Sequence, residues 1–98
     1  MDVNRLVVIR GRVQGIGYRA WTEYTALERG VQGWVRNRSD GSVEALFAGS
    51  AEVVAAMIEA CRQGPPGARV NAIDQREADP SELALRRRGE QFSVLGNA

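Results

Sequence analysis

The stretch RLVVIRGRVQGIGYRAWTEYTALERG (residues 5–30) has the pattern of a strand, a glycine-rich connection and a helix. Apolar residues occur on both parities from Leu6 to Val13, as in a strand that is buried on much of both faces. From Tyr18 to Arg29 apolar residues recur at helical spacing, and Gly30 stands where such a helix would end. The residues that we expect this helix to bury are Ala20, Trp21, Tyr24 and Leu27.

The next segment predicts a β-hairpin followed by a second helix. VQGWVRN (residues 31–37) and SVEALFAG (residues 42–49) both alternate, and Asp40 and Gly41 supply a tight turn between them. Val43, Ala45 and Phe47 then share one face of the second hairpin strand. Ser50 can cap a helix with an apolar stripe, and GPPG (residues 64–67) ends that helix.

The remaining pattern completes an α+β fold. ARVNAIDQRE (residues 68–77) predicts a fourth strand and QFSVL (residues 91–95) a short last strand, while residues 81–88 are polar and form at most a helical turn. This order predicts a ferredoxin-like split βαβ sandwich, βαββαβ, with an antiparallel sheet and two helices on one face. We expect residues 1–98 to form a single domain of this kind.

Composition limits the chemistry that is available. All 13 basic residues are arginines and the chain has no histidine. Schiff-base lysines, histidine bases and histidine metal ligands are therefore excluded. The single cysteine, Cys61, allows neither an internal disulfide nor a thiolate cluster, and we expect it in the core. We therefore expect no metal and no cofactor.

Charge and hydropathy limit the partners in the same way. A net charge of +1 argues against a nucleic-acid partner held by bulk electrostatics. The run Arg86–Arg88 is interpreted as a solvated loop. Four consecutive apolar residues before Arg10 do not resemble a signal peptide, and no stretch reaches the length of a membrane span. We expect a cytoplasmic monomer that acts on a small molecule, with no membrane partner.

The glycine-rich connection suggests an anion site. Arg19 would lie at a helix N-terminus, where the helix dipole disfavours a cation unless an anion is bound beside it. Backbone amides from Gln14 to Arg19 could converge on phosphate oxygens, and the Arg19 guanidinium could bind two of them. A connection that merely turns the chain explains the same glycines. The residues alone leave both interpretations open.

Known phosphate-binding motifs fit this connection poorly. Gly15, Gly17 and Ala20 match the dinucleotide fingerprint in form, but the following strand leads into a hairpin rather than a parallel βαβ unit. A Walker loop requires a lysine. A phosphotyrosine-phosphatase loop requires a cysteine where Val13 stands. Any phosphate chemistry at this connection must therefore proceed without a Walker lysine and without a cysteine nucleophile.

Asn37 is the second candidate. It has the parity of Val31, Gly33 and Val35, at the end of a strand and just before the hairpin turn. An asparagine in that position is commonly a turn former. It can act with the glycine connection only if the two are close in space, which the sequence leaves open.

The two segments together resemble a known family. GRVQGIGYR (residues 11–19), followed 14 residues later by GWVRNRSDGSVE (residues 33–44), resembles the two signature motifs of the acylphosphatases. The resemblance implies a small cytosolic ferredoxin-like enzyme that hydrolyses the carboxyl–phosphate bond of acyl phosphates without a metal. It implies that Arg19 binds the phosphate and that Asn37 positions the attacking water. The backbone cradle would consist of Gln14, Gly15, Ile16, Gly17 and Tyr18.

The expected function is therefore metal-independent acyl phosphate hydrolysis by in-line attack of water. Such chemistry asks a protein mainly for positioning and charge stabilisation. One alternative is an acylphosphatase-like accessory domain that binds an anion without attacking it. Another is a ferredoxin-like RNA-binding module, although the aromatic stacking pattern of such modules is missing. The ending FSVLGNA (residues 92–98) departs from the basic or aromatic ending frequent in the family.

Overall fold

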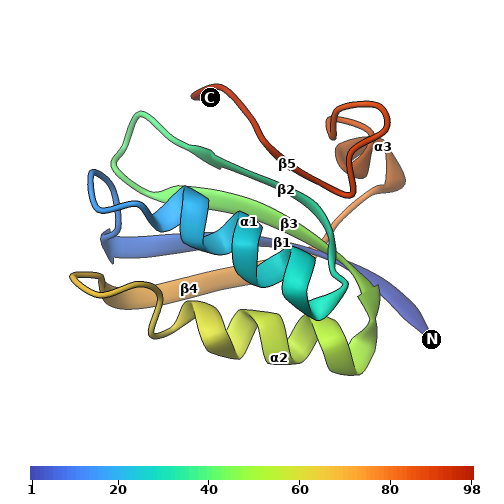
Figure 1. The fold of residues 1–98 in the computed structure, drawn as a ribbon, viewed down its shortest axis with the longest axis horizontal. Helices are drawn as coiled ribbons and strands as arrows, with labels where there is room; N and C mark the ends of the chain where they lie inside the picture. The colour runs from blue at the N-terminus through green and yellow to red at the C-terminus, as the bar shows by residue number, and fades with distance from the viewer.

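The computed structural model describes residues 1–98 as one five-stranded sheet with two long helices on one face (Figure 1). The strands lie in the order β4-β1-β3-β2-β5. This is the ferredoxin-like α+β arrangement that the sequence predicts. The elements are β1 (Asp2–Arg12), α1 (Tyr18–Arg29), β2 (Gln32–Asn37), β3 (Val43–Ser50), α2 (Ala51–Cys61), β4 (Arg69–Glu77), α3 (Pro80–Leu83) and β5 (Phe92–Val94).

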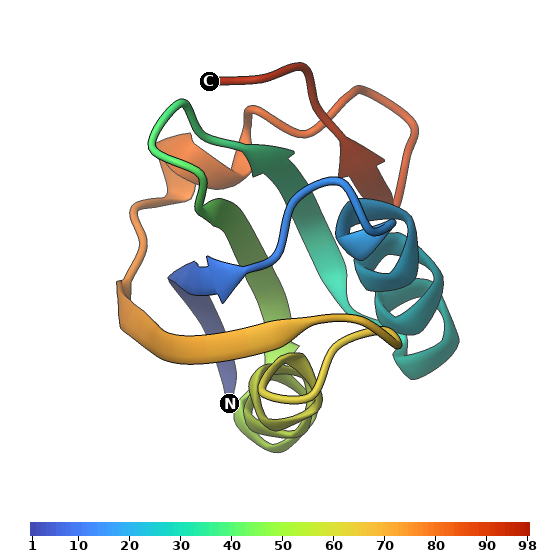
Figure 2. The same cartoon turned by 90° about the vertical axis from the view of Figure 1, so that its left-hand side faces the viewer.

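One edge of the sheet differs from the expected antiparallel arrangement. β4, β1, β3 and β2 are antiparallel to their neighbours, but β5 runs parallel to β2, with Gly33 opposite Phe92 and Val35 opposite Val94. β5 follows β4 in the chain, although the two strands lie at opposite edges of the sheet. The chain between them, including α3, passes on the face opposite α1 and α2 (Figure 2). Local patterns do not reveal such a long-range arrangement.

Both faces of the sheet bury apolar side chains. The larger core lies between the sheet and the helices α1 and α2, and it includes Val43, Ala45 and Phe47 as predicted. A second cluster lies on the other face of the sheet, beside α3, and it comprises Leu6, Trp34, Leu46, Ala48 and Ala78. The two clusters explain why β1 and β3 are apolar at both parities.

The buried face of α1 is not the one predicted from its apolar residues. Tyr24 and Leu27 are 66% and 47% exposed, and Ala20 is also exposed. The helix instead packs through Tyr18, Thr22, Thr25 and Ala26. Thr22 tolerates burial because its hydroxyl donates to the Tyr18 carbonyl at 2.8 Å, which leaves its methyl group for packing. Of the predicted face, only Trp21 packs against the core.

The hairpin turn is longer than the two residues predicted. β2 ends at Asn37 and β3 begins at Val43, so five residues, 38–42, connect them. The Asp40 carboxylate accepts hydrogen bonds from the Ser42 backbone N–H at 3.0 Å and from the Ser42 hydroxyl at 2.5 Å. These bonds lower the pKa of Asp40 below its usual value. The turn is therefore held by its own side chains.

α2 follows the prediction closely. The Ser50 hydroxyl accepts a hydrogen bond from the Val53 backbone N–H at 3.2 Å and so caps the helix. Cys61 is fully buried at the other end, and burial raises the pKa of its thiol to about 12. The thiol therefore belongs to the core, as expected. None of the helices in the structure combines the length and the apolar character needed to cross a membrane.

Candidate active site

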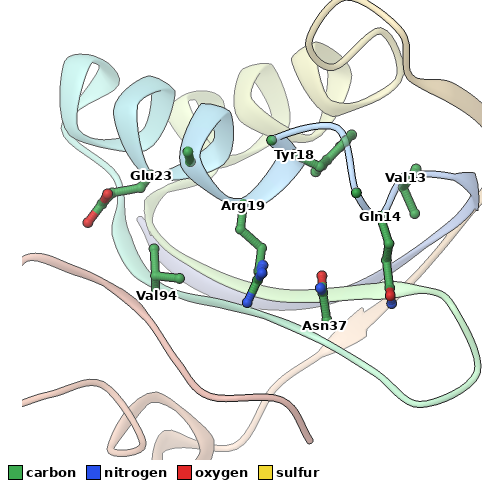
Figure 3. Close-up of a pocket in the computed structure, with 10 residues that line it drawn as sticks. Val13, Gln14, Tyr18, Arg19, Glu23, Asn37 and Val94 are labelled. Carbon is green, nitrogen blue, oxygen red and sulfur yellow. The ribbon is translucent and has the colours of Figure 1, made fainter.

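A cavity of about 460 Å³ lies at the N-terminal end of α1 (Figure 3). Four elements supply its walls: the connection between β1 and α1, the first turns of α1, the end of β2, and β5. It brings the glycine-rich connection and Asn37 together, which the sequence could not establish. The lining residues are Val13, Gln14, Gly15, Gly17, Tyr18, Arg19, Ala20, Glu23, Asn37 and Val94.

The connection from Val13 to Gly17, called the loop below, presents backbone to the cavity. Gly15 and Gly17 have φ angles of +77° and +83°, the left-handed region in which glycine is favoured. Gly17 occupies the N-cap of α1, and no side chain caps the helix there. The first N–H groups of α1 are thus free to bind an anion. Ile16 does not line the cavity, because its side chain packs against the core.

Tyr18 fixes the end of the loop to the rest of the protein. Its hydroxyl donates a hydrogen bond of 2.6 Å to the carbonyl of Cys61, at the end of α2. Burial of the phenol raises the pKa of Tyr18. A methyl group at position 64 would lie 2.5 Å from the Tyr18 ring. Only glycine therefore allows the chain after α2 to pass this close to the ring. The loop therefore ends on a rigid support.

Arg19 carries the positive charge of the cavity, and most of its hydrogen-bonding capacity is unused. The side chain is half-buried and lies beside Asn37 in Figure 3. Its one hydrogen bond within the protein is a long one of 3.5 Å to the side-chain oxygen of Asn97. No carboxylate forms an ion pair with it, although Glu23 lies one helical turn away. The planar guanidinium is free to bind two oxygens of an anion.

Asn37 has a fixed backbone and a free side chain. It pairs with Val43 of β3, and its carbonyl accepts a 2.9 Å hydrogen bond from the N–H of Ala98. The side-chain amide, which lines the cavity, makes no hydrogen bond within the protein. Such an amide can bind a water molecule or a substrate oxygen.

The Gln14 side chain makes contacts that the sequence did not predict. Its side-chain amide turns toward the hairpin and donates to the carbonyls of Arg38 and Ser42, at 2.9 and 2.8 Å. Sequence analysis also missed four lining residues, Val13, Ala20, Glu23 and Val94. For Glu23 a signal existed, because it lies four residues after Arg19 and thus on the same side of α1.

The cavity as a whole suits a small tetrahedral anion and a water molecule. Helix N–H groups and the Arg19 guanidinium supply positive potential, while the Asn37 amide supplies neutral hydrogen-bonding groups. Nowhere in the structure do three or more His, Cys, Asp or Glu side chains gather in a way that could hold a metal ion. The arrangement can bind a phosphoryl group and hold a nucleophile beside it.

Sequence comparison connects this cavity with a known family. The profile of the family Acylphosphatase matches residues 5–93. The acylphosphatase of Bradyrhizobium diazoefficiens is 62% identical over 89 residues, which cover 91% of this chain and 90% of that protein. The matched region contains the loop, Arg19 and Asn37.

Comparison with solved structures agrees with the sequence match. The crystal structure of acylphosphatase from Bacillus subtilis superposes with a TM-score of 0.81 at 32% identity, covering 97% of this chain and 99% of that one. Full-length HypF in its phosphate- and nucleotide-bound form superposes with a TM-score of 0.83 at 26% identity. That match covers 99% of this chain but 12% of HypF, so the same fold also occurs as a small part of a much larger protein.

Proposed function

The chain belongs to the acylphosphatase family, whose members hydrolyse acyl phosphates, and we propose that this chain does so in the cavity beside the start of α1. One observation carries the proposal. A loop with free helix N–H groups, an arginine without an ion-pair partner and an asparagine with a free amide all line the same cavity. Each of these groups is available to substrate because the protein itself does not use it.

In this proposal the phosphoryl group binds between the loop and Arg19. Backbone N–H groups from Gln14 to Arg19 surround its oxygens, and the guanidinium binds two of them. In the transition state the charge is spread over the three equatorial oxygens, and donors already fixed around them stabilise it with little reorganisation. Arg19 and the loop are therefore the phosphate-binding groups of the proposed site.

Asn37 holds the attacking water in line with the bond that breaks. The water oxygen forms a bond to phosphorus, and the bond from phosphorus to the acyl oxygen breaks with its electron pair on the carboxylate. An amide is too weak a base to take the proton, so the proton passes to a phosphate oxygen of the substrate. A carboxylate is a good leaving group and needs no strong general acid.

Three broader properties belong to the same proposal. We propose that residues 1–98 act as one domain, since the family profile spans residues 5–93. We propose a monomer, because few large hydrophobic side chains are exposed, namely those of Met1, Tyr24, Leu27 and Leu85. We propose the cytoplasm as the compartment, in keeping with a single buried thiol.

A second candidate function is anion binding without hydrolysis. The likeness to a small part of HypF favours it, because there the same fold lies within a larger protein. In that case the cavity would bind inorganic phosphate, but it would not turn over an acyl phosphate.

The test is hydrolysis of benzoyl phosphate in excess EDTA, after subtraction of the spontaneous rate. We expect metal-independent turnover by the wild type and none with p-nitrophenyl phosphate, whose phenolate leaves less readily than a carboxylate. Asn37→Ala should lower kcat roughly 10²-fold, as loss of one transition-state donor does, with the inhibition constant of inorganic phosphate nearly unchanged. Asn71→Ala, an exposed position on β4, is the matched control.

Two outcomes would contradict the proposal. A folded wild type that binds phosphate but does not hydrolyse benzoyl phosphate would favour the binding function. Equal losses of kcat and of phosphate affinity in Asn37→Ala would make Asn37 a binding or structural residue rather than the group that positions water.

A further inference from the structure

The Gln14 side chain joins the two halves of the proposed site. Its amide nitrogen donates to the Arg38 carbonyl at 2.9 Å and to the Ser42 carbonyl at 2.8 Å. Arg38 directly follows Asn37, and Ser42 directly precedes Val43, the β3 residue that pairs with Asn37. The amide therefore bridges the first and last residues of the hairpin turn, directly beside the Asn37–Val43 pair. Both N–H donors are used, so none remains for the phosphate.

These two hydrogen bonds are not needed to complete the hairpin turn. The Arg38 carbonyl also accepts from the Gly41 N–H at 3.2 Å, and the Ser42 carbonyl also accepts from the Arg38 N–H at 2.9 Å. Neither carbonyl would lose its last partner if the Gln14 amide were removed. The bonds therefore do something other than satisfy the turn.

What they do follows from the topology of the sheet. The loop extends from β1, whereas Asn37 ends β2, and β3 lies between these two strands. No strand pairing thus sets the distance from the loop to Asn37 directly. Among the hydrogen bonds of the structure, those of the Gln14 amide alone connect residues 13–17 with residues 37–43. The nearby Arg10–Asp40 ion pair, 3.5 Å long, is exposed and contributes little.

We propose that Gln14 is a positioning residue, whose side chain sets the place of Asn37 relative to the bound phosphoryl group. This inference rests on the proposed function, because it assigns Gln14 a part in aligning the water with phosphorus. It predicts an effect on kcat rather than on phosphate binding. A displacement of about 1 Å between nucleophile and target can cost roughly 100-fold in rate.

The side chain at position 14 must be long and must carry two donors. Asparagine is shorter by one methylene, and glutamate would place a carboxylate against two carbonyl oxygens. Methionine has a similar length and shape, no charge and no N–H donor. Gln14→Met is therefore the substitution that removes the connection with the least other change. Gln75→Met, at an exposed position on β4, is the matched control.

The first readout is steady-state hydrolysis of benzoyl phosphate. We expect Gln14→Met to lower kcat roughly 10- to 100-fold, with the inhibition constant of inorganic phosphate within about threefold of wild type and the melting temperature nearly unchanged. In the Asn37→Ala background the same substitution should cost less than about threefold, because Gln14 acts through Asn37. Full additivity of the two substitutions would overturn the proposal, as would a loss of phosphate affinity equal to the loss of kcat.

The second readout needs no turnover. In ¹⁵N-labelled protein, inorganic phosphate should shift the backbone signals of Gly15 and Gly17 and the side-chain amide signal of Asn37. Gln14→Met should keep the glycine shifts and lose the Asn37 shift, while Gln75→Met keeps all three. An Asn37 shift that survives in Gln14→Met would overturn the proposal. The expected pattern in a protein without turnover would support positioning by Gln14 while refuting the hydrolytic function.

Discussion

The loop at residues 13–17 and the segment around α3 are both irregular, but they use their polar groups in opposite ways. In the loop and the first turn of α1, helix N–H groups and the Arg19 guanidinium have almost no partners within the protein. Around α3, Glu82 accepts two hydrogen bonds from Arg76, at 2.9 and 2.7 Å, and one from the Asp79 N–H at 2.9 Å. Its carbonyl accepts a further bond from the Trp34 indole.

The difference indicates how this small protein divides stability from function. Polar groups around α3 are bonded to one another and hold the connection that leads from β4 to β5. The backbone N–H groups at the start of α1 and the Arg19 guanidinium are left for a ligand. Substitutions at the loop should therefore change the rate and spare the stability, and substitutions around α3 should do the reverse.

Arg19→Ala should give the largest effect. We expect kcat/KM for benzoyl phosphate to fall by at least roughly 10³-fold, because charge stabilisation and ground-state binding are both lost. The melting temperature should stay within about 2 °C, because a half-exposed side chain without an ion pair adds little stability. Arg62→Ala, an exposed position after α2, is the control. Near-normal turnover of Arg19→Ala would refute this comparison, because the unpaired guanidinium would then have no role in catalysis.

Tyr18→Phe should show that Tyr18, although it directly follows the loop, contributes to stability rather than to the rate. The change removes the 2.6 Å hydrogen bond to the Cys61 carbonyl and leaves that buried group unpaired. A loss of about 1–3 kcal/mol is expected, which lowers the melting temperature by about 5–15 °C. Hydrolysis at 25 °C should stay within about threefold, because the ring still supports the loop. Tyr24→Phe, at a residue that is 66% exposed, should change neither property.

A large loss of rate in Tyr18→Phe without a loss of stability would contradict this division. It would mean that the hydroxyl acts on the geometry of the loop rather than on the packing of α1 against α2.

Glu82→Gln tests the opposite region through pH. Hydrogen bonds from Arg76 and the Asp79 backbone lower the pKa of Glu82 from 4.5 to about 2. A carboxylate with a lowered folded-state pKa stabilises the fold above its unfolded pKa and loses this effect as pH falls toward the folded value. The melting temperature of Glu82→Gln should therefore lie below that of the wild type at pH 7, and the difference should shrink between pH 4.5 and 2.

Hydrolysis by Glu82→Gln at pH 7 should match the wild type, because the residue lies away from the cavity. A difference in melting temperature that does not change with pH would show that the Glu82 carboxylate does not stabilise the fold through its charge. A clear loss of activity would show that the α3 segment affects the site.

Glu23→Gln should produce the smallest change. Its carboxylate lines the cavity without an ion pair and adds negative potential where an anion binds. Neutralising it should lower KM for benzoyl phosphate about twofold at low salt, and the gain should vanish near 1 M salt, where the Debye length is about 3 Å. Glu28→Gln, exposed near the end of α1, is the control. A KM that rises in Glu23→Gln would indicate that the carboxylate contacts the substrate directly.

The fold was predictable wherever local signals determine it. The bounds of α1 follow from Gly17 and Gly30, which adopt the left-handed conformation at its two ends, and α2 starts at the predicted cap Ser50. The buried face of α1 was not predictable from apolar spacing, because a threonine such as Thr22 packs as well as an apolar residue when its hydroxyl finds a backbone partner. The parallel pairing of β5 joins it to β2, a strand more than 50 residues earlier in the chain, and no short pattern encodes a pairing over that distance.

The candidate site was predictable in its residues but not in its assembly. Arg19 at a helix N-terminus suggested an anion site on electrostatic grounds, and Asn37 became meaningful only through the family resemblance. Their shared cavity depends on the sheet order, which brings the end of β2 near a loop that leaves β1. The Gln14 bridge joins residues 24 and 28 positions apart, and side-chain partners at such distances leave no local trace in a sequence.

The pairing of β1 with β4 has a consequence for how the chain folds. That pairing joins residues as distant as Arg5 and Glu77, whereas the β2–β3 hairpin closes over the five residues 38–42. Loop-closure entropy grows with the length of the chain that is enclosed, so the β1–β4 contact is the costly one. Domains with such non-local pairing fold more slowly than helical bundles of similar size. We expect the hairpin and α1 to form first and the docking of β4 to limit the folding rate.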